Sequence, residues 1–294
     1  MTNKCILCDV ARTSIRLFTI RCSLVEVSLL STMEALRIVE YYTAAVVWCV
    51  VYGIVFKYIS PWLSFRLSKT YRQLTLGQRI DWDSRITSTL NSLITGPISV
   101  YLILSDNELG DNPIWGHSRP ALHLLAMMVG YTLTDLLILL YYYSYWKHMG
   151  ALEYAGYIAH HVGVLVAYIM CCLTFGNLAY FAVFRLTCEN STLFVNTKWL
   201  LDTKGFSKSS KPYVVNGLAL ALSWFVFRIA AIPPYWYVVY TVYGTAQYNR
   251  LLVLNKYIWI VTCLVLDVLN IKWFSRIVRG AKRILQKSKQ AHSE

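Results

Sequence analysis

Two adjacent histidines, His160 and His161, lie inside a long apolar stretch of the chain. A histidine beside a carboxylate can act as a general base, because the carboxylate fixes the tautomer and the orientation of the imidazole. At about 1.5 Å per helical residue, the histidines lie about 10 Å, and Asp135 and Glu189 about 15 Å, from the same end of their predicted helices. These four residues are the candidate catalytic residues. A purely structural hydrogen-bonded pair is the alternative.

A metal site at the two histidines is not predicted. Adjacent residues on a helix point about 100° apart, so at most one of the two rings is aimed at the axis of a helix bundle. No third ligand follows either histidine at the i+4 position.

Four further charged residues fall in apolar stretches: Arg185, Arg228, Lys256 and Asp267. A charged side chain at the centre of a bilayer costs roughly 2.5 to 3.5 kcal/mol, so these residues must face inward and pair. We predict that Arg185 pairs with Glu189, since the two are four residues apart on one helix, and that Arg228 and Lys256 lie nearer the other end.

The composition explains why these residues stand out. The chain has 294 residues, of which 56% are hydrophobic and only 15% are charged. A soluble domain carries about 25% charged residues, and a disordered chain is far less hydrophobic. Because the net charge of +13 comes from short basic segments between apolar runs, no nucleic-acid partner is predicted. The chain is therefore predicted to be an integral membrane protein.

The predicted fold is an all-α, polytopic helix bundle of about seven transmembrane helices around an inward polar cavity, with six helices as the alternative. A span needs about 20 apolar residues. Six stretches are strong candidates: 41–57, 86–105, 121–146, 154–174, 213–237 and 251–274. A seventh stretch, at 178–198, is a weaker candidate.

The distribution of Lys and Arg favours seven spans. With seven, the connections at 57–85, 147–153, 198–212 and 272–294 share one side and hold 18 Lys and Arg, whereas the opposite side holds only Arg119 and Arg250. Since cytosolic loops carry the excess of basic residues, the C-terminus is predicted to be cytosolic and the start of the first span lumenal.

Four segments organise the chain. Residues 1–38 form an N-terminal extension, which is dispensable if Met33 serves as an internal start. Residues 39–75 hold the first transmembrane helix and a cytosolic loop, 76–275 form the main domain, and 276–294 are a basic cytosolic tail.

A series of segments from about residue 76 to residue 272 resembles the TLC-domain family, which is named for the TRAM, Lag and CLN proteins and includes the ceramide synthases. The segments are GYTLTDL (130–136), AHHVGVL (159–165), FRLTCENSTLFVNTKW (184–199), YVVNGLALAL (213–222), VYGTAQYNRLLVL (242–254) and LVLDVLNIKW (264–273). His160 and His161 match the paired histidines that ceramide synthases use in catalysis. Where those enzymes have two aspartates, this chain has Glu189 alone, followed by Ser191 and Thr192.

The resemblance implies a protein of the endoplasmic reticulum that acts in membrane lipid homeostasis and binds an acyl lipid in an intramembrane cavity. Asp267, Arg185, Arg228 and Asn196 are the candidate ligand contacts. The alternative is an acyl-CoA-dependent N-acyltransferase, with acyl-CoA as co-substrate and a sphingoid base as acceptor. A seven-helix receptor is a remote alternative, because no DRY triplet ends the third span and no NPxxY lies in the last.

Overall fold

The computed structural model describes residues 32–146 and 150–291, with side chains up to residue 282. Most of the predicted N-terminal extension, residues 1–31, therefore lies outside the described residues. The chain divides into two units, Met1–Thr43 and Ala44–Glu294. The described part of the first unit, residues 32–43, is helical.

Most of the described residues are helical, and no strand occurs among them. Six helical stretches are long and apolar enough to cross a membrane, which confirms a polytopic helical bundle. They are Thr32–Leu67, which contains the π-helix η1 (Val55–Ile59) and α2 (Ser60–Leu67); α4 (Leu76–Ser105); α6 (Arg119–Tyr141); α8 (Ala151–Ala167) with η3 (Tyr168–Thr174); α11 (Lys211–Trp224) with η5 (Phe225–Ile229) and α12 (Ile232–Val242); and α14 (Val253–Ala291).

A seventh helical stretch corresponds to the weak span predicted at 178–198. It consists of α9 (Ala179–Leu186), a 3₁₀ turn η4 (Thr187–Ser191) and α10 (Thr192–Thr203). All three parts pack along α4. The contact is so close that a Cβ atom on Gly96 of α4 would lie 2.9 Å from Asn190 of η4. Because neighbouring helices enclose this stretch, it tolerates polar residues that lower its hydropathy.

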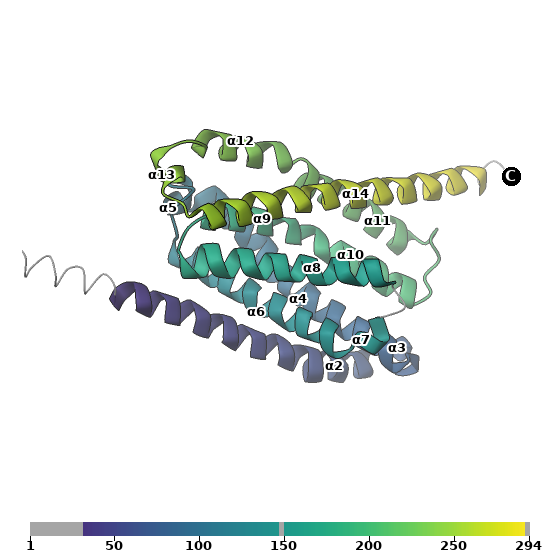
Figure 1. Cartoon of the computed structure of the whole chain (residues 1–294). Coiled ribbons are helices and arrows are strands. Elements are labelled where there is room, and N and C mark those ends of the chain that lie inside the picture. The colour runs from purple at the N-terminus through teal and green to yellow at the C-terminus, as the bar shows by residue number, and fades with distance from the viewer. Residues whose placement is uncertain (1–31, 147–149, 292–294) are drawn as a thin grey trace, which may run out of the picture. The chain divides into compact units, whose positions relative to one another are not determined.

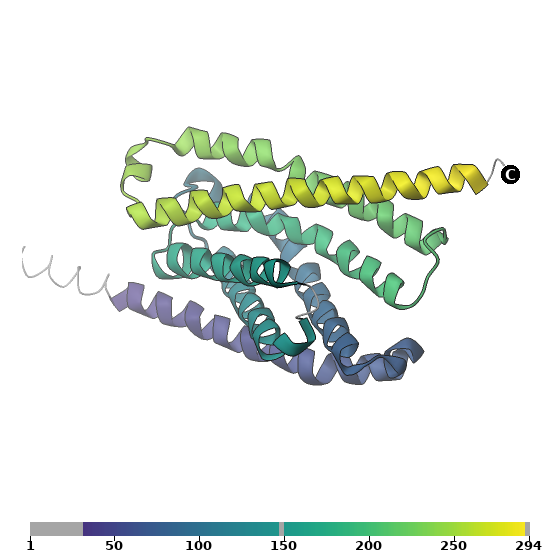
Figure 2. The same ribbon diagram turned by 45° about the vertical axis from the view of Figure 1, so that its right-hand side comes forward.

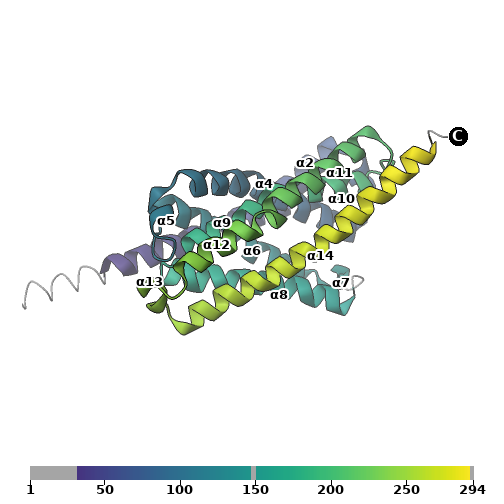
Figure 3. The same ribbon diagram turned by 90° about the horizontal axis from the view of Figure 1, so that it is seen from above.

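The helices run back and forth between two ends of the second unit (Figures 1 and 2). The short helices α3 (Lys69–Gln73) and α7 (Tyr143–Trp146), the loop after α10 and the C-terminal end of α14 lie at one end. The other end holds α5 (Asn107–Asp111), α13 (Ala246–Asn249) and the connection before α9, as Figure 3 also shows from above. This alternation is the one that seven spans require, and it gathers the basic connections at a single end.

Hydrogen bonds between distant segments fix the less basic end. The Leu178 N–H donates to the Ile114 carbonyl oxygen at 2.6 Å, and the Trp115 indole donates to the Gln247 carbonyl oxygen at 3.1 Å. Hydrogen bonds therefore join the connection 106–118 to two other connections at this end, 175–178 and 243–252.

The basic end is held by a buried carboxylate. Asp83, near the start of α4, accepts hydrogen bonds from Ser60 of α2 at 2.6 Å and from Tyr71 of α3 at 2.7 Å. Burial of the Tyr71 ring and its bond to Asp83 raise the pKa of the phenol above its ordinary range, so Tyr71 stays a neutral donor. A capping box of Thr75 and Gln78 then begins α4 at a defined residue. These bonds fix the short segment between the first two spans.

Candidate functional site

His161 and Asp135 form the centre of the candidate site, where α8 packs against α6. His161 Nε2 lies 2.8 Å from Asp135 Oδ2, and the two side chains are 11% and 18% exposed. Ser84 of α4 donates to the other carboxylate oxygen of Asp135 at 3.0 Å. Of the four candidate catalytic residues, the structure therefore brings these two into direct contact.

Both ring nitrogens of His161 are occupied. Nδ1 lies 2.8 Å from the carbonyl oxygen of Tyr157, which can only accept, so Nδ1 carries a proton. Nε2 and Asp135 then share a second proton between them. In either distribution of that proton, His161 keeps no free lone pair for a substrate. His161 therefore orients and balances charge in this arrangement rather than acting as a free base.

His160 offers the free nitrogen. Its ring stands edge-on to that of His161, with centroids 5.4 Å apart and an interplanar angle of 87°. Nδ1 of His160 is buried and has no hydrogen-bond partner among the described residues. A buried polar atom without a partner is costly, which makes His160 the histidine best placed to bind a ligand.

Arg185 pairs with Asp267 and not with Glu189, so the predicted pair within one helix is wrong. Nη1 and Nη2 of Arg185 reach the two carboxylate oxygens of Asp267 at 2.5 and 3.1 Å. The guanidinium also lies 3.8 Å from the centroid of the Tyr235 ring, and the Trp236 indole donates to Asp267 at 2.7 Å. The pair is thus a bidentate bridge between α9 and α14, closed by aromatic rings from α12.

Arg228 has only neutral partners. Its Nε donates to Ser191 at 2.7 Å, and its two Nη atoms donate to Asn270 at 3.2 Å and Thr192 at 3.4 Å. The prediction that Arg228 lies nearer the opposite end is therefore wrong, because η5 brings it to the 3₁₀ turn η4.

The remaining predicted residues are dispersed. Glu189 lies in η4, with its Oε1 4.0 Å from Cys188 Sγ. Asn196 ties α10 to α4 through a bond to Thr89 at 3.1 Å. Lys256 lies at the start of α14, 4.6 Å from the centroid of the Tyr248 ring and outside the histidine layer.

Sequence reasoning missed several partners of these groups: Ser84, Tyr235, Trp236 and Asn270. Asn270 could have been found, since it lies three residues after Asp267 on the same side of α14. Tyr235 and Trp236 give no such signal, because an aromatic residue near the end of a predicted span fits a position at the membrane surface equally well. The structure gives both rings a role inside the bundle.

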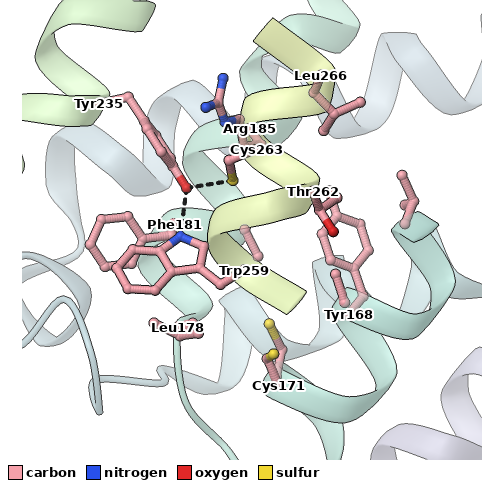
Figure 4. A pocket seen from close by; sticks show the side chains of 14 residues that line it. Tyr168, Cys171, Leu178, Phe181, Arg185, Tyr235, Trp259, Thr262, Cys263 and Leu266 are labelled. Carbon is pink, nitrogen blue, oxygen red and sulfur yellow. Dashed lines mark hydrogen bonds between the residues drawn. The ribbon is translucent and has the colours of Figure 1, made fainter. Parts of the chain in front are cut away.

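An apolar pocket of about 50 Å³ lies between η3, α9, α12 and α14 (Figure 4). Inside it, the Tyr235 hydroxyl accepts a hydrogen bond from the Trp259 indole at 2.7 Å and lies 2.9 Å from Cys263 Sγ. Arg185 is the charged residue among its lining. The pocket begins at Val164, one helical turn along α8 from the histidines.

No group of three His, Cys, Asp or Glu side chains within the described ranges is arranged to hold a metal ion.

Comparison with known proteins places these features in one family. The family model of the TLC domain matches residues 81–279. The chain is 40% identical over 245 residues to TLC domain-containing protein 4-A of Xenopus laevis, an alignment that covers 81% of this chain and 92% of that protein. It is 35% identical over 239 residues to TLC domain-containing protein 4 of Homo sapiens, covering 81% of this chain and 88% of the human protein. TLC domain-containing protein 2 of Danio rerio is 26% identical over 221 residues, with 72% and 81% covered. No solved structure matches the chain.

Proposed function

Because the chain belongs to the TLC-domain family, we propose that it binds an acyl lipid within its helix bundle and acts in membrane lipid homeostasis, in the membrane of the endoplasmic reticulum. The observation that carries the proposal is the stacking of an apolar pocket on a layer of buried polar side chains. A lipid has the same division between a hydrocarbon chain and a polar head.

Three helical stretches change from polar to apolar in the same direction. Each has polar residues toward the basic end and pocket residues toward the other end. On α8 and η3, the polar residues are His160 and His161 and the pocket residues are Val164 and Tyr168. On η4 and α9, the polar residues are Glu189 and Arg185 and the pocket residues are Ala182 and Phe181. On α14, the polar residues are Asn270 and Asp267 and the pocket residues are Cys263 and Trp259.

The two parts of this site would contribute differently to binding. Lipid tails are as apolar as the pocket, so moving a chain from the bilayer into the protein gains little hydrophobic free energy. The pocket would therefore select the chain by shape. Affinity would come from the polar layer, where the unpartnered Nδ1 of His160 gains a hydrogen bond.

A pocket-filling variant tests the proposal. Ala167 lines the pocket, whereas Ala155 is exposed on the same helix. Ala167→Phe should lower the amount of acyl lipid that co-purifies with the protein, measured by native mass spectrometry, and Ala155→Phe should leave it unchanged. Equal lipid occupancy in the two variants would contradict the proposed site.

A second candidate function, acyl transfer, is favoured by the free Nδ1 of His160. His160 would remove a proton from the amine of a sphingoid base while the nitrogen attacks the thioester carbonyl of an acyl-CoA. The amide bond forms, the thioester bond breaks, and coenzyme A leaves as a thiol that takes up the proton. His161 and Asp135 would hold the His160 ring in position.

Purified protein supplied with an acyl-CoA and a sphingoid base separates the two functions. An amide product that disappears in His160→Ala would support acyl transfer. Bound lipid without any product would support binding alone.

A further inference from the structure

We propose that a basic stripe on the C-terminal part of α14 binds anionic phospholipids at the surface of the membrane that the bundle spans. The stripe consists of Lys272, Arg276, Arg279 and Lys282, all of which are exposed. In each view, this part of α14 extends past the start of α11 (Figures 1, 2 and 3). None of the four residues lines the pocket, so the inference is independent of the proposed acyl-lipid site.

Contacts on the other side of α14 fix the direction in which the stripe faces. Spacings of three and four residues keep consecutive members of the stripe on one face of the helix. Away from that face, the Trp273 ring packs against Trp224 and the Phe274 ring against Phe225, each with centroids 6.0 Å apart. These contacts with α11 and η5 hold the aromatic side of α14 inward and leave the basic side outward.

The stripe begins where the lipid-facing surface of α14 ends. From residue 257 to residue 271 the exposed side chains of α14 are apolar or tyrosine: Tyr257, Val261, Leu264, Val265, Val268 and Ile271. From residue 272 to residue 282 the exposed residues are the four members of the stripe, Ser275 and Gly280. Because apolar exposed surface faces the hydrocarbon chains of a bilayer, this change marks the edge of the hydrocarbon region.

All four cations are within reach of phospholipid heads. At about 1.5 Å per residue, Lys282 lies about 15 Å along the helix from Lys272. The headgroup layer is about 5 to 7 Å thick, and the field of a charged surface extends about 8 Å beyond it at physiological ionic strength. The stripe therefore lies within the headgroup layer and the adjoining region where the surface field acts.

Carboxylates do not neutralise the stripe. The sequence has no Asp or Glu from residue 268 to residue 293, and none of the four cations forms an ion pair within the described ranges. Three other carboxylates at the basic end have partners elsewhere: Asp81, Asp83 and Asp202. Glu153, exposed at the start of α8, pairs with none of the four. Even with Glu153 counted, the stripe keeps a surplus of positive charge.

A phospholipid fits this surface better than a soluble anion does, because the stripe continues directly from the lipid-facing side of the helix. Arginine binds phosphate through two N–H groups at once, and lysine binds it as a point charge. Arg279 Nε donates to the Ser275 carbonyl oxygen at 3.2 Å, which leaves its Nη atoms for a phosphate. Each basic side chain near an anionic membrane surface strengthens association about five-fold.

Native mass spectrometry of the full-length protein tests the proposal. The protein is titrated with phosphatidylserine or with phosphatidylcholine of the same acyl chains. The wild type should bind phosphatidylserine at least five-fold more tightly, the effect of one such basic contact. Arg276→Gln combined with Arg279→Gln should lose most of this preference, whereas Arg276→Lys combined with Arg279→Lys should keep it.

A matched control removes the same charge from another part of the basic end. Lys204 and Lys208 are exposed in the loop after α10. Lys204→Gln combined with Lys208→Gln should therefore leave the preference for phosphatidylserine unchanged. Thermal melts confirm that each variant is folded.

Three lipid-binding results would overturn the proposal: equal binding of the two lipids by the wild type, a preference that survives the two glutamine substitutions at Arg276 and Arg279, or an equal loss in the control variant. An oligonucleotide that binds the wild type but not the glutamine variant, without any lipid preference, would assign the stripe to a nucleic acid instead. These results leave the pocket untouched, since Ala167→Phe tests it separately.

Discussion

Removal of Asp267 should destabilise the protein by leaving a buried guanidinium without its counter-charge. The Arg185 and Asp267 side chains are only 14% and 8% exposed, so solvent screens them little. Loss of one partner from a buried ion pair costs about 3 to 5 kcal/mol. Arg185 would retain its contact with the Tyr235 ring, worth about 1 to 2 kcal/mol, so we expect Asp267→Ala to cost about 3 kcal/mol.

A double-mutant cycle isolates the pair. Arg185→Met combined with Asp267→Leu replaces both charges by apolar groups of similar size and should fall within about 1 kcal/mol of the wild type. Unfolding in mixed detergent micelles, titrated with a denaturing detergent, gives the free energies. Arg185→Met combined with Glu189→Gln is the control, in which the second substitution should not recover the stability that Arg185→Met loses. If the control is rescued, or if the Asp267 double variant loses the sum of the two single losses, the assigned pairing is refuted.

Three further predictions follow from the packing and topology. Gly130→Ala should lower the melting temperature by several degrees, because a Cβ there would lie 2.6 Å from the Ala45 carbonyl oxygen. Gly163→Ala should leave the melting temperature unchanged, because nothing lies within 4 Å of a Cβ there. Equal melting temperatures for the two variants would refute the close helix contact. His161→Ala should leave Asp135 with Ser84 as its remaining partner and lower the free energy of unfolding by about 1 to 3 kcal/mol. His160→Ala should lower the stability in detergent melts by less. A larger loss of stability in His160→Ala than in His161→Ala would contradict the assignment of the two roles. A glycosylation acceptor inserted near Asp111 should be modified and one near Lys208 should not, since the basic end is predicted to be cytosolic; modification at Lys208 alone would invert the topology.

The sequence predicted most of the bundle, since each apolar run of about 20 residues formed a helix. The stretch 179–203 was harder because Arg185 and Glu189 lower its hydropathy, and only the charges of the loops favoured it. Its polar residues became explicable once α4 was seen to pack along it. Counting residues along regular helices predicted that His160, His161, Asp135 and Glu189 lie in one half of the bundle, and the structure pairs His161 with Asp135.

The same counting failed where the helices are irregular. A 3₁₀ turn has 3.0 residues per turn, so η4, which begins at Thr187, rotates Glu189 away from the side of the helix that Arg185 occupies. Arg185 then takes a partner 82 residues away, which no local pattern reveals. Likewise, the π-helix η5 contains Arg228, and a depth counted at regular spacing misplaced that residue.

The central claim is that an acyl chain lies in the pocket beside the histidines, and site-specific photolabelling tests it most directly. A fatty acid carrying a diazirine near its methyl end, incorporated in cells that produce the full-length protein, should label the pocket residues within 164–185 and 259–266. The label should decrease in Ala167→Phe and persist in Ala155→Phe. Labelling confined to exposed positions such as Leu93, Tyr101 and Leu104, with none in the pocket, would contradict the account.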